Sequence, residues 1–143
     1  MIFTSDAEIV VIGTGLLDRT LPKPAWKHEA HLAAALWIIR TRPDLDAERD
    51  LPGIIRAYNE ATGVPNSDTR GYHHTITLAS LRAIRAVMAG LPADLPLFEI
   101  CNALIASPYG DKRWPLNFWR EAAVFSPAAR HGWVEPDVRA LPF

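Results

Sequence analysis

The sequence predicts an all-α fold, a compact helical bundle of four main helices with shorter helices added, built as a single domain over residues 1–143. Three observations support this prediction. Apolar residues recur at helical spacing along most of the chain, prolines and glycines divide it into helix-sized segments, and the alternating polar–apolar pattern of a half-buried strand is missing. Nearly half of the residues are hydrophobic, which is enough for one core in a chain of this length.

The first helix is predicted over residues 6–18, where Ser5 and Glu8 have the spacing of a capping box. Gly13 weakens this helical pattern, and residues 10–12 could form a short strand instead.

The second helix is predicted over residues 24–40, because Pro24 suits a first helical turn and Pro43 lies just beyond the end. Within residues 30–39 His31 is the only ionisable residue. A helix that is apolar around most of its circumference belongs in the middle of a fold.

The third helix is predicted over residues 44–62, with Asp44 as its N-terminal cap. Pro52 and Gly53 are expected to kink this helix or to split it in two. The polar segment over residues 63–71 is expected to be a loop.

The remaining helices follow from the same signals. A fourth is predicted from residues 73–75 to about residue 89, a fifth over residues 95–106 and a sixth over residues 115–124. Ser126 followed by Pro127 predicts one more short helical turn, and the end of the chain is expected to be irregular.

Composition argues against several classes of partner. The formal net charge is −1 and no block of like charges stands out, whereas nucleic-acid binding usually needs a basic patch. No basic segment precedes the apolar run over residues 9–17, so a signal peptide is not expected. No apolar segment reaches 18 residues, so a membrane span is not expected either. The cytoplasm is therefore the expected location. Cys101, the single cysteine, is expected to be a small buried hydrophobic residue.

The histidines give the strongest indication of a functional site. Four of the five fall in two pairs, His28 with His31 and His73 with His74. Residues three apart share a helix face, so the first pair can point the same way. The helical row through His73 is apolar and faces inward, whereas the row through His74 leads to arginines and turns toward water. His28, His31 and His73 are therefore predicted to hold a divalent transition metal: Zn, Fe or Cu.

A metal site of this kind would keep open positions for water or substrate. Each ligating imidazole also needs a partner for its second ring nitrogen. The candidates for that role are Glu60, Asn59, Asp68, Tyr58, Tyr72, Thr75 and Thr77.

Two other interpretations of the histidines stay open: a pocket without metal, and histidines that only make structural hydrogen bonds. The spacing lacks the H-E-x-x-H pattern of zinc proteases, no His-Asp pair is present, and no C-x-x-C motif occurs. Gly13-Thr14-Gly15 lacks the context of a dinucleotide-binding loop. Trp114, Phe118 and Trp119 are expected to pack in the core, and His131 is expected at the surface.

The strings W-K-H-E-A-H-L-A-A-A-L, I-R-A-Y-N-E-A-T-G and G-Y-H-H-T-I-T, with the late F-S-P-A-A-R-H-G-W-V-E-P-D, span most of the chain. They resemble a group of small bacterial proteins of unknown function with the pattern H-x-x-H-L followed by Y-H-E-T-x-T. The resemblance puts emphasis on His28, His31, His73, Thr75 and Thr77. His74 stands where the group's pattern has glutamate, so a carboxylate at this position is lost and His74 is a possible substitute.

The leading functional interpretation is a small metal-dependent enzyme that acts on a small molecule by hydrolytic or oxygen chemistry. Tyr72 or Glu60 would give acid–base help, and His74 would act as a proton carrier. The alternatives are a small-ligand-binding module without catalysis, in which histidine and tyrosine bind an organic or anionic ligand, and a structural protein that forms a homodimer through exposed tryptophans.

Overall fold

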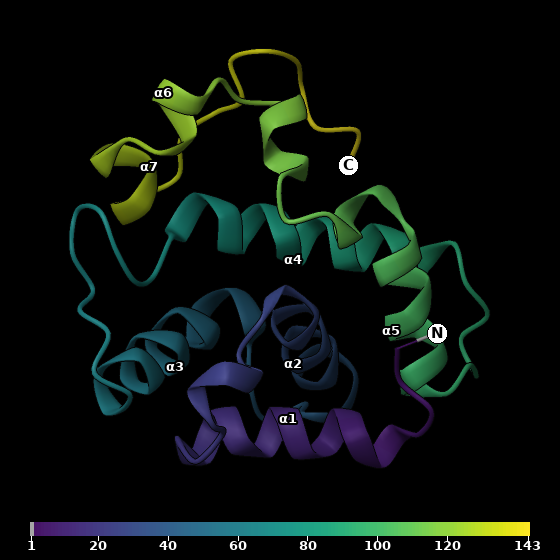
Figure 1. The fold of residues 1–143 in the computed structure, drawn as a ribbon. Helices are drawn as coiled ribbons and strands as arrows, with labels where there is room; N and C mark the ends of the chain where they lie inside the picture. Colours follow the sequence, from purple (N-terminus) through teal and green to yellow (C-terminus); the bar gives the residue numbers. More distant parts are fainter. Residues whose placement is uncertain (1) are drawn as a thin grey trace.

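The structure, a computed structural model, describes residues 2–143, and this part of the chain contains helices and no strand (Figure 1). The predicted all-α fold is therefore confirmed. Its body consists of the five long helices α1 (Asp6–Asp18), α2 (His28–Thr41), α3 (Ala47–Ala61), α4 (His74–Ala89) and α5 (Leu97–Ala106). The shorter elements are η1 (Lys23–Ala25), η2 (Pro108–Gly110), η3 (Trp114–Asn117), α6 (Glu121–Val124) and α7 (Pro127–His131).

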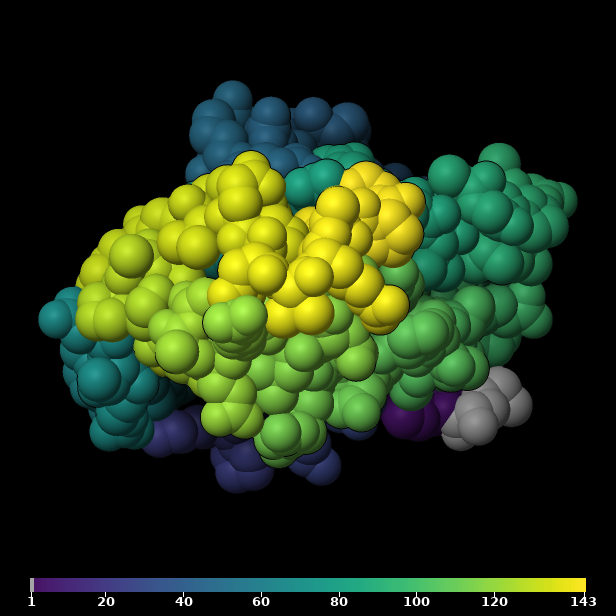
Figure 2. All heavy atoms as spheres, turned by 90° about the horizontal axis from the view of Figure 1, so that it is seen from above, coloured from purple at the N-terminus to yellow at the C-terminus, as the bar shows by residue number. Residues whose placement is uncertain are grey.

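The long helices are arranged around α2. In Figure 1, α1 lies on one side of α2 and α3, while α4 crosses on the other side and α5 lies at one end. The last part of the chain, with η3, α6 and α7, lies on the outer face of α4. Figure 2 shows this segment from above, where it spreads over the body of the molecule.

The main core confirms the central place expected for α2. Every residue over 32–38 is buried, so neighbouring elements cover α2 on all sides along this stretch. From α1, Ile9 and Leu16 pack into the same core, and from α5, Ile100 and Leu104 do so. Within residues 2–143, no helix combines the length and the hydropathy needed to cross a membrane.

A second, smaller core lies between α4 and the C-terminal segment. Ala79 and Ala83 form a fully buried row of small side chains on α4, and the indole rings of Trp114 and Trp119 belong to the same cluster. Small residues let bulky rings approach a helix closely. The expectation that Trp114, Phe118 and Trp119 pack in the core is confirmed, since each is at most 8% exposed.

The start of α2 differs from the prediction. The helix was expected from residue 24, but residues 23–25 form the separate turn η1, and α2 begins at His28. The change of direction at Trp26 and Lys27 puts His28 in the first turn of α2 and brings the indole of Trp26 back over the helix, where it stacks on His31.

The predicted cap and split of the third helix are wrong. Asp46, not Asp44, caps α3 by accepting a hydrogen bond from the backbone N–H of Arg49 at 3.0 Å, because the carboxylate of Asp44 is paired with Arg42 at 2.8 Å. The helix also continues through Pro52 without a break. A proline removes one backbone hydrogen bond, and the buried Leu51 and Ile55 on either side hold both halves of α3 against the core.

The predicted sixth helix is wrong as a continuous element, since η3 and α6 are separated at residues 118–120. Two backbone groups there bond to the end of the chain and not within a helix. The carbonyl of Phe118 accepts from the N–H of Val138 at 2.9 Å, and the N–H of Arg120 donates to the carboxylate of Asp137 at 2.8 Å. Residues 136–138, which lie far along the chain, therefore interrupt the helix.

Two further expectations are confirmed. Ser126 caps α7 by accepting from the N–H of Ala129 at 3.2 Å, and the chain after α7 contains no regular element. Cys101 is fully buried, and desolvation raises the pKa of its thiol to about 12, so this sulfur is an inert core atom.

Candidate functional site

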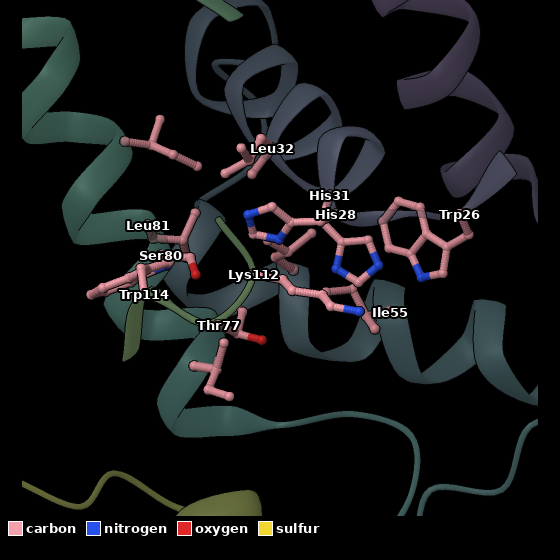
Figure 3. A pocket seen from close by; sticks show the side chains of 14 residues that line it. Trp26, His28, His31, Leu32, Ile55, Thr77, Ser80, Leu81, Lys112 and Trp114 are labelled. Carbon is pink, nitrogen blue, oxygen red and sulfur yellow. The ribbon is translucent and has the colours of Figure 1, made fainter. Parts of the chain in front are cut away.

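A cavity of about 580 Å³, counting the space open to solvent, lies between α2, α3 and α4. We call it the apolar cavity. Its walls are mostly hydrocarbon, with Leu32 from α2, Ile55 from α3, Leu81 and Ile84 from α4, and Trp114 from η3. The polar groups that line it are His28, His31, Thr77, Ser80 and Lys112. Figure 3 shows both imidazoles between Trp26 and the α4 side chains, with Lys112 extending past them.

His28 has a fixed tautomer. Its Nε2 lies 2.8 Å from the backbone carbonyl of Tyr109, in η2. A carbonyl oxygen can only accept, so Nε2 carries the proton and donates it, and Nδ1 of the neutral ring keeps a lone pair. Gly110 helps to place this carbonyl, because a Cβ at this position would lie 1.8 Å from the backbone oxygen of Ile105 and the turn can pass there only without a side chain.

His31 lies one turn further along α2 and stacks on Trp26, with ring centroids 3.9 Å apart and an interplanar angle of 28°. Neither of its ring nitrogens bonds to another residue in the range 2–143. His31 is an exposed residue by its accessible area, although the indole of Trp26 and the cavity walls surround its ring. This desolvation, with a smaller contribution from the neighbouring His28, lowers the pKa of His31 from 6.5 to about 4. The imidazole is therefore neutral at neutral pH.

The low pKa of His31 predicts a loss of stability in acid. An unfolded chain takes up a proton at this ring near pH 6.5, whereas the folded protein resists it down to about pH 4. Between these values the unfolded state binds more protons, so the free energy of unfolding falls as the pH falls. One proton sets an upper limit of about 1.4 kcal/mol per pH unit, and solvent in the cavity reduces the effect. His31→Gln should therefore flatten the decline measured by urea unfolding. A variant with the full wild-type decline would contradict this assignment.

A second cavity of about 920 Å³, again counting space open to solvent, continues from the first. We call it the polar cavity. The two share a wall made of Trp26, His31, Ile55, Ile76 and Thr77. The polar side chains that line only the second cavity are Lys23, Tyr58, Asn59, Thr62, Tyr72 and His73. His31 thus lies between the apolar cavity and a second cavity that has more polar side chains in its wall.

His73 lines the polar cavity but uses both ring nitrogens elsewhere. Its Nδ1 accepts from the backbone N–H of Ile76 at 3.2 Å, which makes His73 the N-terminal cap of α4. Its Nε2 donates to the carbonyl of Val124 at 2.6 Å. Desolvation lowers the pKa of this ring, which favours the neutral form that both bonds require. Both ring nitrogens of His73 are therefore engaged in the folded protein, although the sequence predicted that His73 would ligate a metal together with His28 and His31.

The metal site stays a prediction. Within residues 2–143, no three or more histidine, cysteine or carboxylate side chains are grouped so that they could hold a metal ion. The structure brings together two of the three predicted ligands, His28 and His31, on the first turns of α2.

The three residues predicted for acid–base roles are placed as follows. The hydroxyl of Tyr72 lies 2.9 Å from Nδ1 of His74, and the guanidinium of Arg56 lies 4.4 Å from the centre of the Tyr72 ring. Tyr72 lines the polar cavity, whereas His74 is half-buried outside both cavities. Desolvation, followed by the nearby Arg56, lowers the pKa of His74. Glu60 is exposed on α3 and lines neither cavity.

Three of the side chains expected to hold the second nitrogen of a ligating histidine, those of Tyr58, Thr75 and Asp68, make other bonds. The hydroxyl of Tyr58 donates to the carbonyl of Leu21, and that of Thr75 donates to the carbonyl of Gly132. Thr75 faces the C-terminal segment, because it lies on the side of α4 that this segment covers. Asp68 accepts from His131 at 2.7 Å, and His131 is at the surface as expected.

Sequence reasoning did not single out Trp26, Tyr109 or Lys112 as parts of this site. Trp26 stands next to the H-E-A-H string, and this proximity was the only signal available for it. Tyr109 contributes a backbone carbonyl, which no side-chain pattern can reveal. Lys112 reaches the cavity from the turn between η2 and η3, whose position depends on tertiary packing.

The charges of the two cavities have one sign. Lys23 and Lys112 line them, and within the described part of the chain no aspartate or glutamate does so. A neighbouring hollow that shares Ile76 and Lys112 with the apolar cavity adds Arg113 and again no carboxylate. An anionic group in these cavities would therefore meet cations and neutral dipoles, and no like charge on their walls.

Comparison of the chain with protein-family models, with curated proteins and with solved structures found no match. The resemblance to the H-x-x-H-L and Y-H-E-T-x-T pattern stays an expectation.

Proposed function

We propose that this protein binds a small organic anion with an apolar body in the cavity between α2, α3 and α4. The observation that carries the proposal is the lining of the two joined cavities: it includes lysines and histidines and, among residues 2–143, no carboxylate. The chain as a whole has 16 acidic residues against 15 basic ones, so this separation of charge is local to the site.

The shape and surface of the apolar cavity support the same ligand class. Small-molecule sites are concave and mostly apolar, with a few polar groups that fix orientation. The apolar cavity has walls of leucine, isoleucine and tryptophan and a few polar side chains among them. Its polar side chains come from α2, from α4 and from the turn that carries Lys112. The ammonium of Lys112 can meet an anionic head while Leu81 and Ile84 contact the hydrocarbon.

Three probes with the same eight-carbon chain test the proposal: octanoate, octylamine and octanol. We expect octanoate to bind more tightly than octanol, because only octanoate pairs with a cation, and we expect octylamine to bind least. Binding can be followed by calorimetry and by the fluorescence of Trp26 and Trp114, which both line the cavity. Equal affinity for the three probes, or preference for the amine, would overturn the proposal.

Two lysine variants provide a matched comparison. Lys112→Gln should lower the affinity for octanoate severalfold and leave octanol binding unchanged, because it removes a charge from the cavity wall. Lys27→Gln removes the same charge from an exposed position that lines neither cavity, so octanoate binding should stay at the wild-type level. An equal loss of octanoate affinity in both variants would mean that the preference for the anion reflects the overall charge of the protein and that the site is misassigned.

One observation favours a second candidate function, binding of a divalent transition metal by His28 and His31. The hydrogen bond from Nε2 of His28 to the carbonyl of Tyr109 is the arrangement that fixes ligating histidines in metal sites, since it leaves Nδ1 free to ligate. Two imidazoles would leave positions for water or for the carboxylate of a bound ligand. When bound there, such a metal would supply Lewis-acid chemistry.

A further inference from the structure

We infer that the ligand extends from the apolar cavity into the polar cavity, and that it carries a hydrogen-bond donor, N–H or O–H, between its apolar tail and its anionic end. This inference rests on the proposed function and names the ligand class more closely. It depends on the orientation of Asn59 and on the hydrogen-bonding capacity left unused in the polar cavity.

The orientation of Asn59 follows from its hydrogen-bond network. Oδ1 of Asn66 accepts from the backbone N–H of Tyr72 at 3.0 Å, and Nδ2 of Asn66 donates to the carbonyl of Arg56 at 3.1 Å. These two bonds identify the oxygen and the nitrogen of the Asn66 amide. The Asn59 atom that lies 3.0 Å from Oδ1 of Asn66 must therefore be its nitrogen, Nδ2. The carbonyl oxygen of Asn59 is the atom on the other side of its amide group.

That oxygen has no hydrogen-bond partner among residues 2–143. Asn59 is only 6% exposed, yet it lines the polar cavity. Among the residues of the range 2–143 that are not exposed, Nε of Arg130 is the only side-chain nitrogen or oxygen that has neither solvent contact nor a hydrogen-bond partner. Because Oδ1 of Asn59 has no partner, it must be in contact with solvent, and it therefore opens onto the cavity. A ligand that displaces solvent from this oxygen without supplying a donor would leave a buried acceptor unpaired, which costs free energy, whereas a ligand with an N–H or O–H here avoids that cost.

The hydroxyl of Thr62, like Oδ1 of Asn59, can only accept a hydrogen bond from a ligand in the polar cavity. Thr62 directs its hydroxyl proton to the backbone carbonyls of Tyr58 and Asn59, at 3.0 and 3.2 Å. Its oxygen can still accept but has no second proton to donate. This part of the polar cavity therefore offers acceptors, and a ligand that matches it must bring an N–H or an O–H.

The charge of the polar cavity places the anionic end of the ligand. Lys23, from η1, is an exposed cation that lines this cavity, while His31 and Trp26 form the wall shared with the apolar cavity. A ligand that lies along both cavities would place its hydrocarbon against Leu81, its donor group near Asn59 and its carboxylate near Lys23. The shorter octanoate, which stays in the apolar cavity, would pair with Lys112 instead. An N-acyl amino acid and a hydroxylated fatty acid both have this order of groups.

N-octanoylglycine, N-octanoylsarcosine and N-octanoylglycine methyl ester are the probes that test this inference. The sarcosine compound lacks the amide N–H and the ester lacks the charge, while the octanoyl tail is the same in all three. We expect N-octanoylglycine to bind about tenfold more tightly than the sarcosine compound, as one hydrogen bond to a buried acceptor would give. We also expect it to bind more tightly than octanoate. Equal affinity for the glycine and sarcosine compounds would overturn the inference.

Two variants assign the contacts. Asn59→Leu should abolish the difference between the glycine and sarcosine compounds while octanoate still binds. Lys23→Gln, at an exposed position, should lower the affinity for N-octanoylglycine and not that for its methyl ester, and Lys27→Gln should change neither. If Asn59→Leu does not fold, the ligand series on the wild-type protein decides alone. Failure of octanoate to bind would overturn the proposed function, whereas octanoate binding without a gain from the glycine group would overturn only this inference.

Discussion

Gly13→Ala should destabilise the protein by about 2 kcal/mol or more and lower its melting temperature by roughly 5–10 °C. A Cβ added at Gly13 would lie 2.3 Å from Cε3 and 2.5 Å from Cδ2 of Trp37. The indole of Trp37 is 6% exposed in the main core and has little room to withdraw. Either α1 or the ring must move, and the resulting loss of packing exceeds the gain of about 1 kcal/mol that alanine brings to a helix interior.

Gly53→Ala is the matched control, since Gly53 lies inside α3 and a Cβ added there would meet nothing within 4 Å. Here only the helix propensity acts, and the variant should be more stable than wild type by up to about 1 kcal/mol. Urea unfolding of both variants measures the contrast. If Gly13→Ala proved as stable as Gly53→Ala, the close approach of α1 to Trp37 would not exist in the folded protein.

The helices of the body were predictable because their signals are local. The boundaries of α1 agree with the periodicity of residues 6–18, and α4 begins within the predicted residues 73–75. The capping box predicted for α1 is wrong, because the side chain of Ser5 makes no cap bond and Glu8 accepts from the N–H and the hydroxyl of Thr4. The errors arise where other side chains compete for the groups that the local signals assign to a helix. Arg42, two residues before Asp44, pairs with its carboxylate, and Asp137, far along the chain, accepts from the backbone N–H of Arg120.

The site was predictable in part for the same reason. His28 and His31 lie on one helix, so their spacing alone places them in one cavity. His73 lies on the helix expected to face them, but its ring turns back to the N–H of Ile76 and to the carbonyl of Val124. A helical row gives the direction of a Cβ and not the side-chain rotamer, and a residue at the cap position lies outside the helical phase. The part that the Tyr109 carbonyl plays in the site could not be predicted from the sequence, because its position depends on the packing of η2.

In a metal titration, His28→Ala and His31→Ala should each lower the affinity by at least about tenfold, whereas His73→Asn should not. The first two substitutions remove the imidazoles of the second candidate function from the apolar cavity. Asparagine at position 73 can still cap α4, because Asn is among the preferred N-cap residues, but it has no imidazole. The ring nitrogens of His73 are already bonded in the folded protein, so the exchange removes no available ligand.

Binding of Co²⁺ to protein without a histidine tag, followed through its visible absorption, gives the measurement. His131→Ala is the surface control, since this ring bonds only to Asp68 and lies outside both cavities. If His73→Asn loses as much affinity as His31→Ala, then His73 leaves its cap to join the metal, and the three-histidine site predicted from the sequence is the correct one. If wild type binds no metal at all, the second candidate function fails. Because Lys112 and the hydrocarbon walls do not depend on a metal, the preference for octanoate would then stand as the separate test of the organic anion site.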